Sequence, residues 1–311
     1  MQPDVEWISQ QIRAAGPVID LRRLVSLYAP LHEVEPYRGV TVSRDLRYGP
    51  HDRNLADIFR TDDQGAPRPI LLFVHGGGYI VGDRRVRPGS PFYDNVALWG
   101  ARYGFLAINM TYRLAPADPW PAAQQDIAAA IAWVRAAAFE WGGDPDAIVL
   151  MGHSAGATHI ACYVAHPEYW ADGIGICGAI LVSPTGGATP DDRALADDLP
   201  FLDHERAYFG SDDALYATRA AVPALAASEV PLLFVGPEFD PAFFQRHLDR
   251  LRDLFTAAGR EDRFIVLDAN NHMSTIFSLN TADIRLGDLV AGFVDDVCGI
   301  ASPRRRIGQT V

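Results

Sequence analysis

The sequence has few cysteines, no long apolar run and no excess of basic residues, and each absence excludes a class of protein. Its three cysteines are scattered without metal-ligand spacing, and such a sparse, odd count is typical of a reducing compartment. No stretch approaches the roughly 18 apolar residues that a membrane-spanning helix needs. A positively charged region followed by an apolar one is also missing at the start, so we predict no signal peptide, no membrane association and a cytoplasmic location.

The charge balance excludes a further class of partner. With 27 basic and 39 acidic residues, the net charge is −12, which argues against nucleic acid because phosphate binding depends on Lys and Arg. The hydrophobic fraction of 49% and the charged fraction of 21% are ordinary for a globular protein. The chain of 311 residues is long enough for a large core, and α/β enzymes of this length often form one domain.

Apolar strand segments and helical patterns follow one another along most of the chain. The predicted strands span residues 40–48, 54–60, 70–74, 104–109, 147–151, 177–183, 231–235 and 263–267. The predicted helices span residues 91–101, 121–140, 154–165, 241–258 and 281–297. After an antiparallel start, this alternation predicts an α/β fold, in which helices cover both faces of a mostly parallel sheet.

Two segments lie outside the alternation. Residues 1–39 carry helical patterning ahead of the sheet, and residues 185–229 form a long insert after a strand. The aromatic residues of the insert are Phe201, Tyr208, Phe209 and Tyr216. We predict a single domain over residues 1–311 in which both segments form a cap or lid, with surface decoration or a dimer contact as the alternatives.

Residues 152–156 read Gly-His-Ser-Ala-Gly and directly follow the apolar run 147–151. A Gly-x-Ser-x-Gly between a buried strand and a helix is typical of a nucleophile elbow, in which the sharp turn holds the serine hydroxyl exposed. We therefore predict Ser154 as a nucleophile.

A second glycine-rich segment, His75 to Gly78, follows the apolar strand 70–74. Backbone N–H groups without side chains in front of them suit the binding of an oxyanion. We predict an oxyanion hole built from the N–H groups of Gly77, Gly78 and Ala155. Together the two motifs indicate an acyl hydrolase.

A serine nucleophile needs a base and an acid that orients it, in the chain order Ser, acid, His. His272 lies in a polar turn after the strand 263–267 and is the predicted base, whereas His247 reads as a solvated residue of the helix 241–258. Asp240, at the junction of a strand and a helix, is the favoured acid. Glu238 is the first competitor, and Asp268 is the second.

The remaining candidate residues are supporting ones. We interpret His153, inside the elbow, and His75, beside the glycines, as structural. The candidate residues of the pocket wall are apolar or aromatic; they are Tyr79, Phe201, Tyr208, Phe209, Phe239, Phe243 and Phe244. Core packing is an equally good interpretation of Phe243 and Phe244, because both lie in a helix.

These motifs resemble those of the α/β-hydrolase superfamily and, within it, of the hormone-sensitive-lipase-like carboxylesterases. The resemblance extends from about residue 68 to residue 275. Tyr112–Pro116, Pro119–Ala123 and Asp126 are similar to the stretch that follows the fourth strand in that family. Glu238–Pro241 resembles the acid motif of the family, and this resemblance supports Asp240.

The elbow departs from the family at its second position. The family usually carries Asp there, whereas this chain has His153 and so resembles the aryl-formamidase and feruloyl-esterase-like branches. The strand pair with Tyr48-Gly49 and Leu55–Phe59 is also similar to those enzymes. The departure concerns the substrate and leaves the expected mechanism unchanged.

The resemblance and the motifs together predict a serine hydrolase that cleaves a carboxylic ester of a small or medium acyl or aryl group. An amidase of the aryl-formamidase type is the first alternative, and a receptor that binds a small molecule without cleaving it is the second. Neither a metal nor an organic cofactor is implied. The resemblance also suggests a homodimer.

Overall fold

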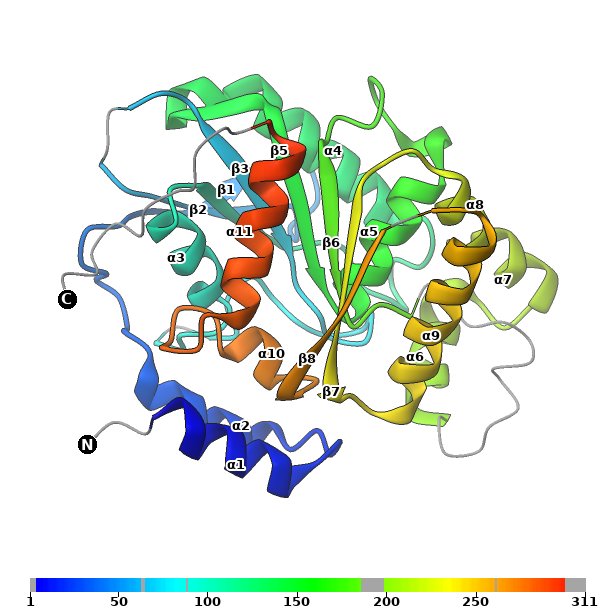
Figure 1. The fold of residues 1–311 in the computed structure, drawn as a ribbon. Coiled ribbons are helices and arrows are strands. Elements are labelled where there is room, and N and C mark those ends of the chain that lie inside the picture. The colour runs from blue at the N-terminus through cyan, green and yellow to red at the C-terminus, as the bar shows by residue number, and fades with distance from the viewer. Residues whose placement is uncertain (1–3, 63–64, 88, 186–198, 261, 300–311) are drawn as a thin grey trace.

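The computed structural model describes residues 4–62, 65–87, 89–185, 199–260 and 262–299. Its centre is an eight-stranded sheet with the strand order β1-β2-β4-β3-β5-β6-β7-β8 (Figure 1). The strands are β1 (Thr41–Arg47), β2 (Leu55–Arg60), β3 (Arg68–Val74), β4 (Leu106–Met110), β5 (Gly143–His153), β6 (Gly178–Val182), β7 (Leu232–Phe239) and β8 (Arg263–Asn271). Strand β2 pairs antiparallel with both β1 and β4, and all the other pairs are parallel. The predicted α/β fold is therefore confirmed.

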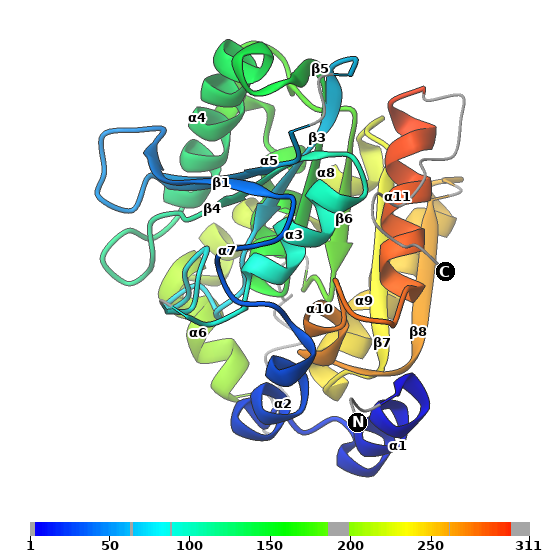
Figure 2. The same cartoon turned by 90° about the vertical axis from the view of Figure 1, so that its left-hand side faces the viewer.

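Helices cover the two faces of the sheet. One face packs against α4 (Ala122–Ala137), α5 (Ala155–Ala165) and α9 (Ala242–Ala257), and the other packs against α3 (Asp94–Arg102), α10 (Ser274–Phe277) and α11 (Arg285–Val297) (Figure 2). Strand β3 supplies both cores, with Ile70 and Leu72 on the first face and Leu71 and Phe73 on the second. Burial on both faces explains why this strand is continuously apolar and does not alternate.

The two predicted cap segments are helical where the structure describes them. Helices α1 (Val5–Ala15) and α2 (Leu21–Tyr28) lie together beneath the ends of β7 and β8, as Figures 1 and 2 both show. The insert contributes α6 (Leu199–Phe209), α7 (Asp213–Arg219) and α8 (Val222–Ala227). Residues 186–198 of the predicted lid lie outside the described residues. Three short 3-10 helices, Ala29–Leu31, Ala138–Trp141 and Pro167–Tyr169, complete the described elements.

The prediction for His247 was wrong. Its side chain is buried and packs edge-on against the ring of Phe243, with the ring centroids 4.6 Å apart. Although its sequence neighbours are charged, His247 lies four residues from both Phe243 and Leu251, so the helical period places all three on the buried face of α9. The predicted strand 263–267 is longer in the structure, where β8 continues to Asn271. Helix α10 was not predicted, because it has only four residues.

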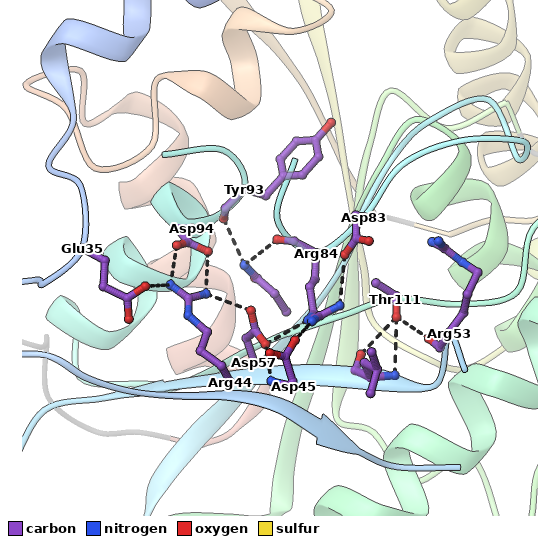
Figure 3. A network of polar contacts seen from close by, with 12 residues as sticks. Glu35, Arg44, Asp45, Arg53, Asp57, Asp83, Arg84, Tyr93, Asp94 and Thr111 are labelled. Atoms are coloured by element: carbon purple, nitrogen blue, oxygen red, sulfur yellow. Dashed lines mark hydrogen bonds and ion pairs between the residues drawn. The ribbon is translucent and has the colours of Figure 1, made fainter. Parts of the chain in front are cut away.

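A buried ionic network joins the antiparallel edge of the sheet to the loop before α3 (Figure 3). The carboxylate of Asp57 accepts from Arg44 at 2.8 Å and from Arg84 at 2.8 Å, and Asp94 accepts from Arg44 at 2.6 Å. Burial favours the neutral acid, but the backbone N–H of Asp45 and the two arginines outweigh it and hold the pKa of Asp57 below its ordinary value. The network fixes the segment around residue 84 against β1 and β2.

Among the described residues, none of the helices is both long enough and apolar enough to cross a bilayer.

Candidate active site

The elbow at Ser154 depends on its two glycines for close packing. Ser154 lies between β5 and α5 with φ 54° and ψ −123°, a strained conformation for a residue with a side chain. A Cβ at Gly152 would lie 2.6 Å from the amide nitrogen of Ala157, and one at Gly156 would lie 2.2 Å from the carbonyl oxygen of Val74. Larger residues would push the turn apart, so the glycines allow the serine to sit at the carboxyl end of β5.

The glycine loop follows β3 at the same end of the sheet. Gly77 and Gly78 have φ values of 135° and 56°, which are accessible to glycine at little cost. A Cβ at Gly77 would lie 2.0 Å from the carbonyl oxygen of Val81. Within the described residues, the N–H groups of Gly77, Gly78 and Ala155 donate to no protein acceptor. Free donors at a cavity wall can receive an oxygen atom that carries negative charge.

Asp240 and His272 meet at the ends of β7 and β8. The Nδ1 atom of His272 lies 2.7 Å from Oδ1 of Asp240, and the two residues are only 4% and 3% exposed. A carboxylate at Nδ1 favours the tautomer that carries its proton there and leaves Nε2 as a base. The two competing acids have another partner, because Arg13 of α1 binds both Glu238, at 3.2 Å, and Asp268, at 2.9 Å.

His153 also contacts the segment of the predicted base. Its Nε2 lies 2.9 Å from the carbonyl oxygen of His272, and the two imidazole centroids are 4.8 Å apart. Burial holds the pKa of His153 well below its ordinary value, so the ring is neutral and Nε2 is the nitrogen that donates. Because His153 directly precedes Ser154, this bond holds the loop of His272 against the elbow. The sequence indicated a structural role but not this partner.

The stretch that resembles the family after its fourth strand supports the glycine loop. The hydroxyl of Tyr112 donates to the carbonyl oxygen of His75 at 2.8 Å, and the His75 ring stacks on that of Tyr112 with the centroids 4.5 Å apart. Burial lowers the pKa of His75 to about 3, so this histidine is neutral. Asp126 accepts from the backbone N–H of Arg113 at 2.7 Å and from its guanidinium at 3.0 Å, which ties the stretch to α4.

Ser154, His272 and the oxyanion-loop glycines line one cavity of about 790 Å³. The phenylalanine and tyrosine rings in its wall are those of Tyr79, Phe92, Tyr93, Phe201, Phe243, Phe244 and Phe277. Of the predicted wall residues, Tyr208 and Phe209 lie outside the lining and are fully buried in the core. Phe239 packs against the other core and is also outside the lining.

Both cap segments reach this cavity. Ile19, Leu21, Arg22 and Val25 line it from the N-terminal segment. Helix α6 contributes Phe201, His204 and Glu205. His204 covers the glycine loop so closely that a Cβ at Gly78 would lie 2.5 Å from its Nδ1.

Sequence reasoning did not single out Glu205 or His204. A helical period through the insert would have found Glu205, because it lies four residues from both Phe201 and Phe209. No comparable local signal marks His204.

Comparison with known proteins identifies the family of this chain. The sequence pattern described as alpha/beta hydrolase fold matches residues 71–274. The chain belongs to this family. The expected resemblance to hormone-sensitive-lipase-like carboxylesterases is confirmed.

Curated relatives of this alpha/beta hydrolase include esterases. It is 36% identical over 138 residues to the esterase LipQ of Mycobacterium tuberculosis, a match that covers 43% of this chain and 31% of LipQ. It is 38% identical over 160 residues to the tuliposide A-converting enzyme b1 of Tulipa gesneriana, a match that covers 49% of this chain and 38% of that enzyme. The alpha/beta hydrolase described here thus spans about a third of the length of these relatives.

Solved structures share the fold of this alpha/beta hydrolase along nearly its whole length. Esterase B from Lactobacillus rhamnosis superposes with a TM-score of 0.75 at 18% identity, over 94% of this chain and 96% of that one. The thermophilic carboxylesterase EstE1 superposes with a TM-score of 0.66 at 19% identity, over 95% of this chain and 98% of that one. At these identities the likeness concerns the fold.

Proposed function

We propose that the protein is a serine carboxylesterase for a small or medium acyl or aryl group. The observation that carries the proposal is the buried bond between His272 and Asp240, because His272 lines the same cavity as Ser154 and the free glycine N–H groups. The names of the curated relatives, among them esterase LipQ, support ester cleavage.

The reaction proceeds in two halves. Nε2 of His272 takes the proton of the Ser154 hydroxyl while the serine oxygen attacks the carbonyl carbon, and Asp240 stabilises the imidazolium that forms. The carbonyl oxygen becomes an oxyanion that accepts from the N–H groups of Gly77, Gly78 and Ala155. His272 then gives its proton to the leaving alcohol, and an acyl-enzyme remains. Water repeats these steps and releases the acid.

The deciding experiment combines labelling with turnover. A fluorophosphonate probe should label the wild type and not Ser154→Ala, and only the wild type should cleave p-nitrophenyl acetate rapidly. A folded wild type that reacts with neither reagent would favour a binding protein on the same fold. Circular dichroism of Ser154→Ala shows whether that variant is folded.

The amide alternative is tested in the same assay. N-formylkynurenine, measured beside p-nitrophenyl acetate, reports whether His272 can also protonate an amine leaving group. A higher kcat/KM for the formamide would assign the amidase reaction.

Cytoplasmic location and a homodimer complete the proposal. Cell fractionation tests the first, and sedimentation equilibrium of the purified protein tests the second.

A further inference from the structure

Glu205 is a buried acid in the wall of the substrate cavity. It lies on α6, lines the cavity together with Ser154 and His272, and is 1% exposed. Among the described residues, no arginine or histidine forms an ion pair with it. Carboxyl groups are seldom buried without a cationic partner, so the burial of Glu205 is unusual.

The protein gives Glu205 only neutral partners. The hydroxyl of Tyr216 donates to Oε2 at 2.6 Å, and the hydroxyl of Tyr79 reaches Oε1 at the long distance of 3.4 Å. Tyr79 also contacts the hydroxyl of Thr185 at 3.1 Å, which in turn contacts that of Thr158 at 3.0 Å. As a carboxylate Glu205 can only accept, and the sole contact of Oε1 among the described residues is the long one from Tyr79. Oε1 therefore has unused accepting capacity.

The surroundings of Glu205 suit a positive charge. Burial and the nearby Glu205 hold the pKa of Tyr79 well above its ordinary value, so this phenol stays neutral. The ring of Phe201 stacks on that of Phe243 at 5.2 Å and meets that of Phe244 at 5.1 Å, and all three line the cavity. Aromatic faces attract ammonium groups, and Phe201 lies one helical turn from Glu205 on α6.

Other charged groups in the cavity lining do not provide the missing charge. Arg22 and Arg87 also line it, but both side chains are exposed to water, where their effect is screened. Asp83 is bound by Arg84 at 3.1 Å. The lining histidines His153, His204 and His272 form no hydrogen bond or ion pair with Glu205 either, so a cationic ligand in the cavity can supply the balancing charge.

We propose that Glu205 binds an ammonium group of the substrate, so that the enzyme prefers esters whose acyl or alcohol part is cationic. This inference rests on the proposed esterase function and adds its substrate class. Glu205 takes no part in the bond-breaking steps. It recognises the substrate by a charge-assisted contact on the α6 side of the cavity.

Two pairs of esters that differ mainly in charge test the proposal. Acetylthiocholine is compared with 3,3-dimethylbutyl thioacetate, and phenyl 6-aminohexanoate with phenyl heptanoate. We expect the wild type to show a kcat/KM about tenfold higher for the cationic ester of at least one pair, since bonds to charged groups carry this much selectivity. In Glu205→Gln the ratio within that pair should fall to about one. The ratio is the readout because a general loss of activity cancels in it.

Tyr216→Phe is the matched control. It removes the bond between α6 and α7 but keeps the carboxyl group, so the preference for the cationic ester should persist. An equal loss in Tyr216→Phe and Glu205→Gln would assign Glu205 a purely structural role and overturn the proposal. A wild type that cleaves p-nitrophenyl acetate without preferring either cationic ester would also overturn it and leave the esterase function intact. If the fluorophosphonate probe and p-nitrophenyl acetate both fail to react, it is the esterase function that is wrong.

Discussion

Asp57 and Glu205 are both buried acids, but their surroundings differ. Asp57 lies on β2 between the guanidinium groups of Arg44 and Arg84 and accepts from the backbone N–H of Asp45 as well (Figure 3). Glu205 lies on α6 and accepts from two phenols. Arginine guanidinium groups neutralise the charge of the first acid inside the protein, whereas the second, a residue of the cavity lining, has no cationic partner among the described residues.

The difference in partners distinguishes Asp57, a structural acid, from Glu205, an acid proposed to recognise the substrate. Arg84 carries the segment whose residues Val86, Arg87 and Ser90 line the cavity, so the network around Asp57 shapes the cavity without facing its contents. An acid with its charge already balanced stabilises the fold and offers nothing to a ligand. An acid with neutral partners contributes less to the fold and remains available for binding.

Asp57→Asn should have the largest effect on stability. The substitution leaves two buried guanidinium groups short of one negative charge, and breaking a buried pair in this way costs about 3–5 kcal/mol. Urea unfolding followed by circular dichroism measures the loss. Asp52→Asn is the control, because Asp52 pairs with Arg47 at the surface and is fully exposed, so its removal should change little. Equal losses of unfolding free energy in Asp57→Asn and Asp52→Asn would show that Asp57 is not a structural acid.

The same network predicts a loss of stability in acid. The folded-state pKa of Asp57 is lower than its ordinary value of 3.8. Its stabilising contribution is therefore complete above that ordinary value and disappears as the pH falls through the folded-state value. The free energy of unfolding of the wild type should decrease below about pH 4, and the difference from Asp57→Asn should shrink there. Parallel curves for the two proteins from pH 3 to 7 would contradict this.

Like Glu205, His153 is a buried polar group with a neutral partner. Its substitution tests whether the bond to the carbonyl oxygen of His272 positions the proposed base. Loss of its bond to the carbonyl oxygen of His272 in His153→Ala should lower kcat for p-nitrophenyl acetate about tenfold, with little change in KM. His153→Gln, whose amide can donate, should recover part of the loss. The pH profile of kcat should keep its shape because burial holds the pKa of His153 well below its ordinary value. A larger change in KM than in kcat would count against a positioning role.

Glu205→Gln should have the smallest effect on stability. The new side-chain carbonyl can still accept from Tyr216, so we expect a change in unfolding free energy of about 1 kcal/mol or less. Unfolding in urea beside Asp57→Asn gives the direct comparison. A loss as large as that of Asp57→Asn would mean that both acids hold the fold together.

Local motifs made most of the fold and part of the site predictable. The glycine loop and the elbow each combine an apolar strand with a turn whose residues are adjacent in the chain, so both could be found without tertiary information. Asp240 and His272 are 32 residues apart, yet each follows a strand, and neighbouring parallel strands bring their carboxyl ends together. Their hydrogen bond agrees with that expectation.

Contacts that depend on how distant elements approach could not be predicted. Phe92 and Phe277 stack with their centroids 3.9 Å apart in the cavity wall, although no periodicity links the two residues. The bond from His153 to the carbonyl oxygen of His272 depends on the approach of two loops in the same way. The helical period of the insert marks Glu205, but its bond to the hydroxyl of Tyr216 could not be predicted, because that bond depends on how α6 docks against α7.

Arg13 makes helix α1 important for the design of recombinant versions of this protein. One guanidinium bridges Glu238, which lies two residues before Asp240, and Asp268, which lies four residues before His272. A recombinant version trimmed to start after residue 16 would leave both carboxylates without this shared cation, beside the loops that carry Asp240 and His272. Shortening the protein to ease its crystallisation, or fusing a bulky partner ahead of α1, would therefore alter the proposed active site.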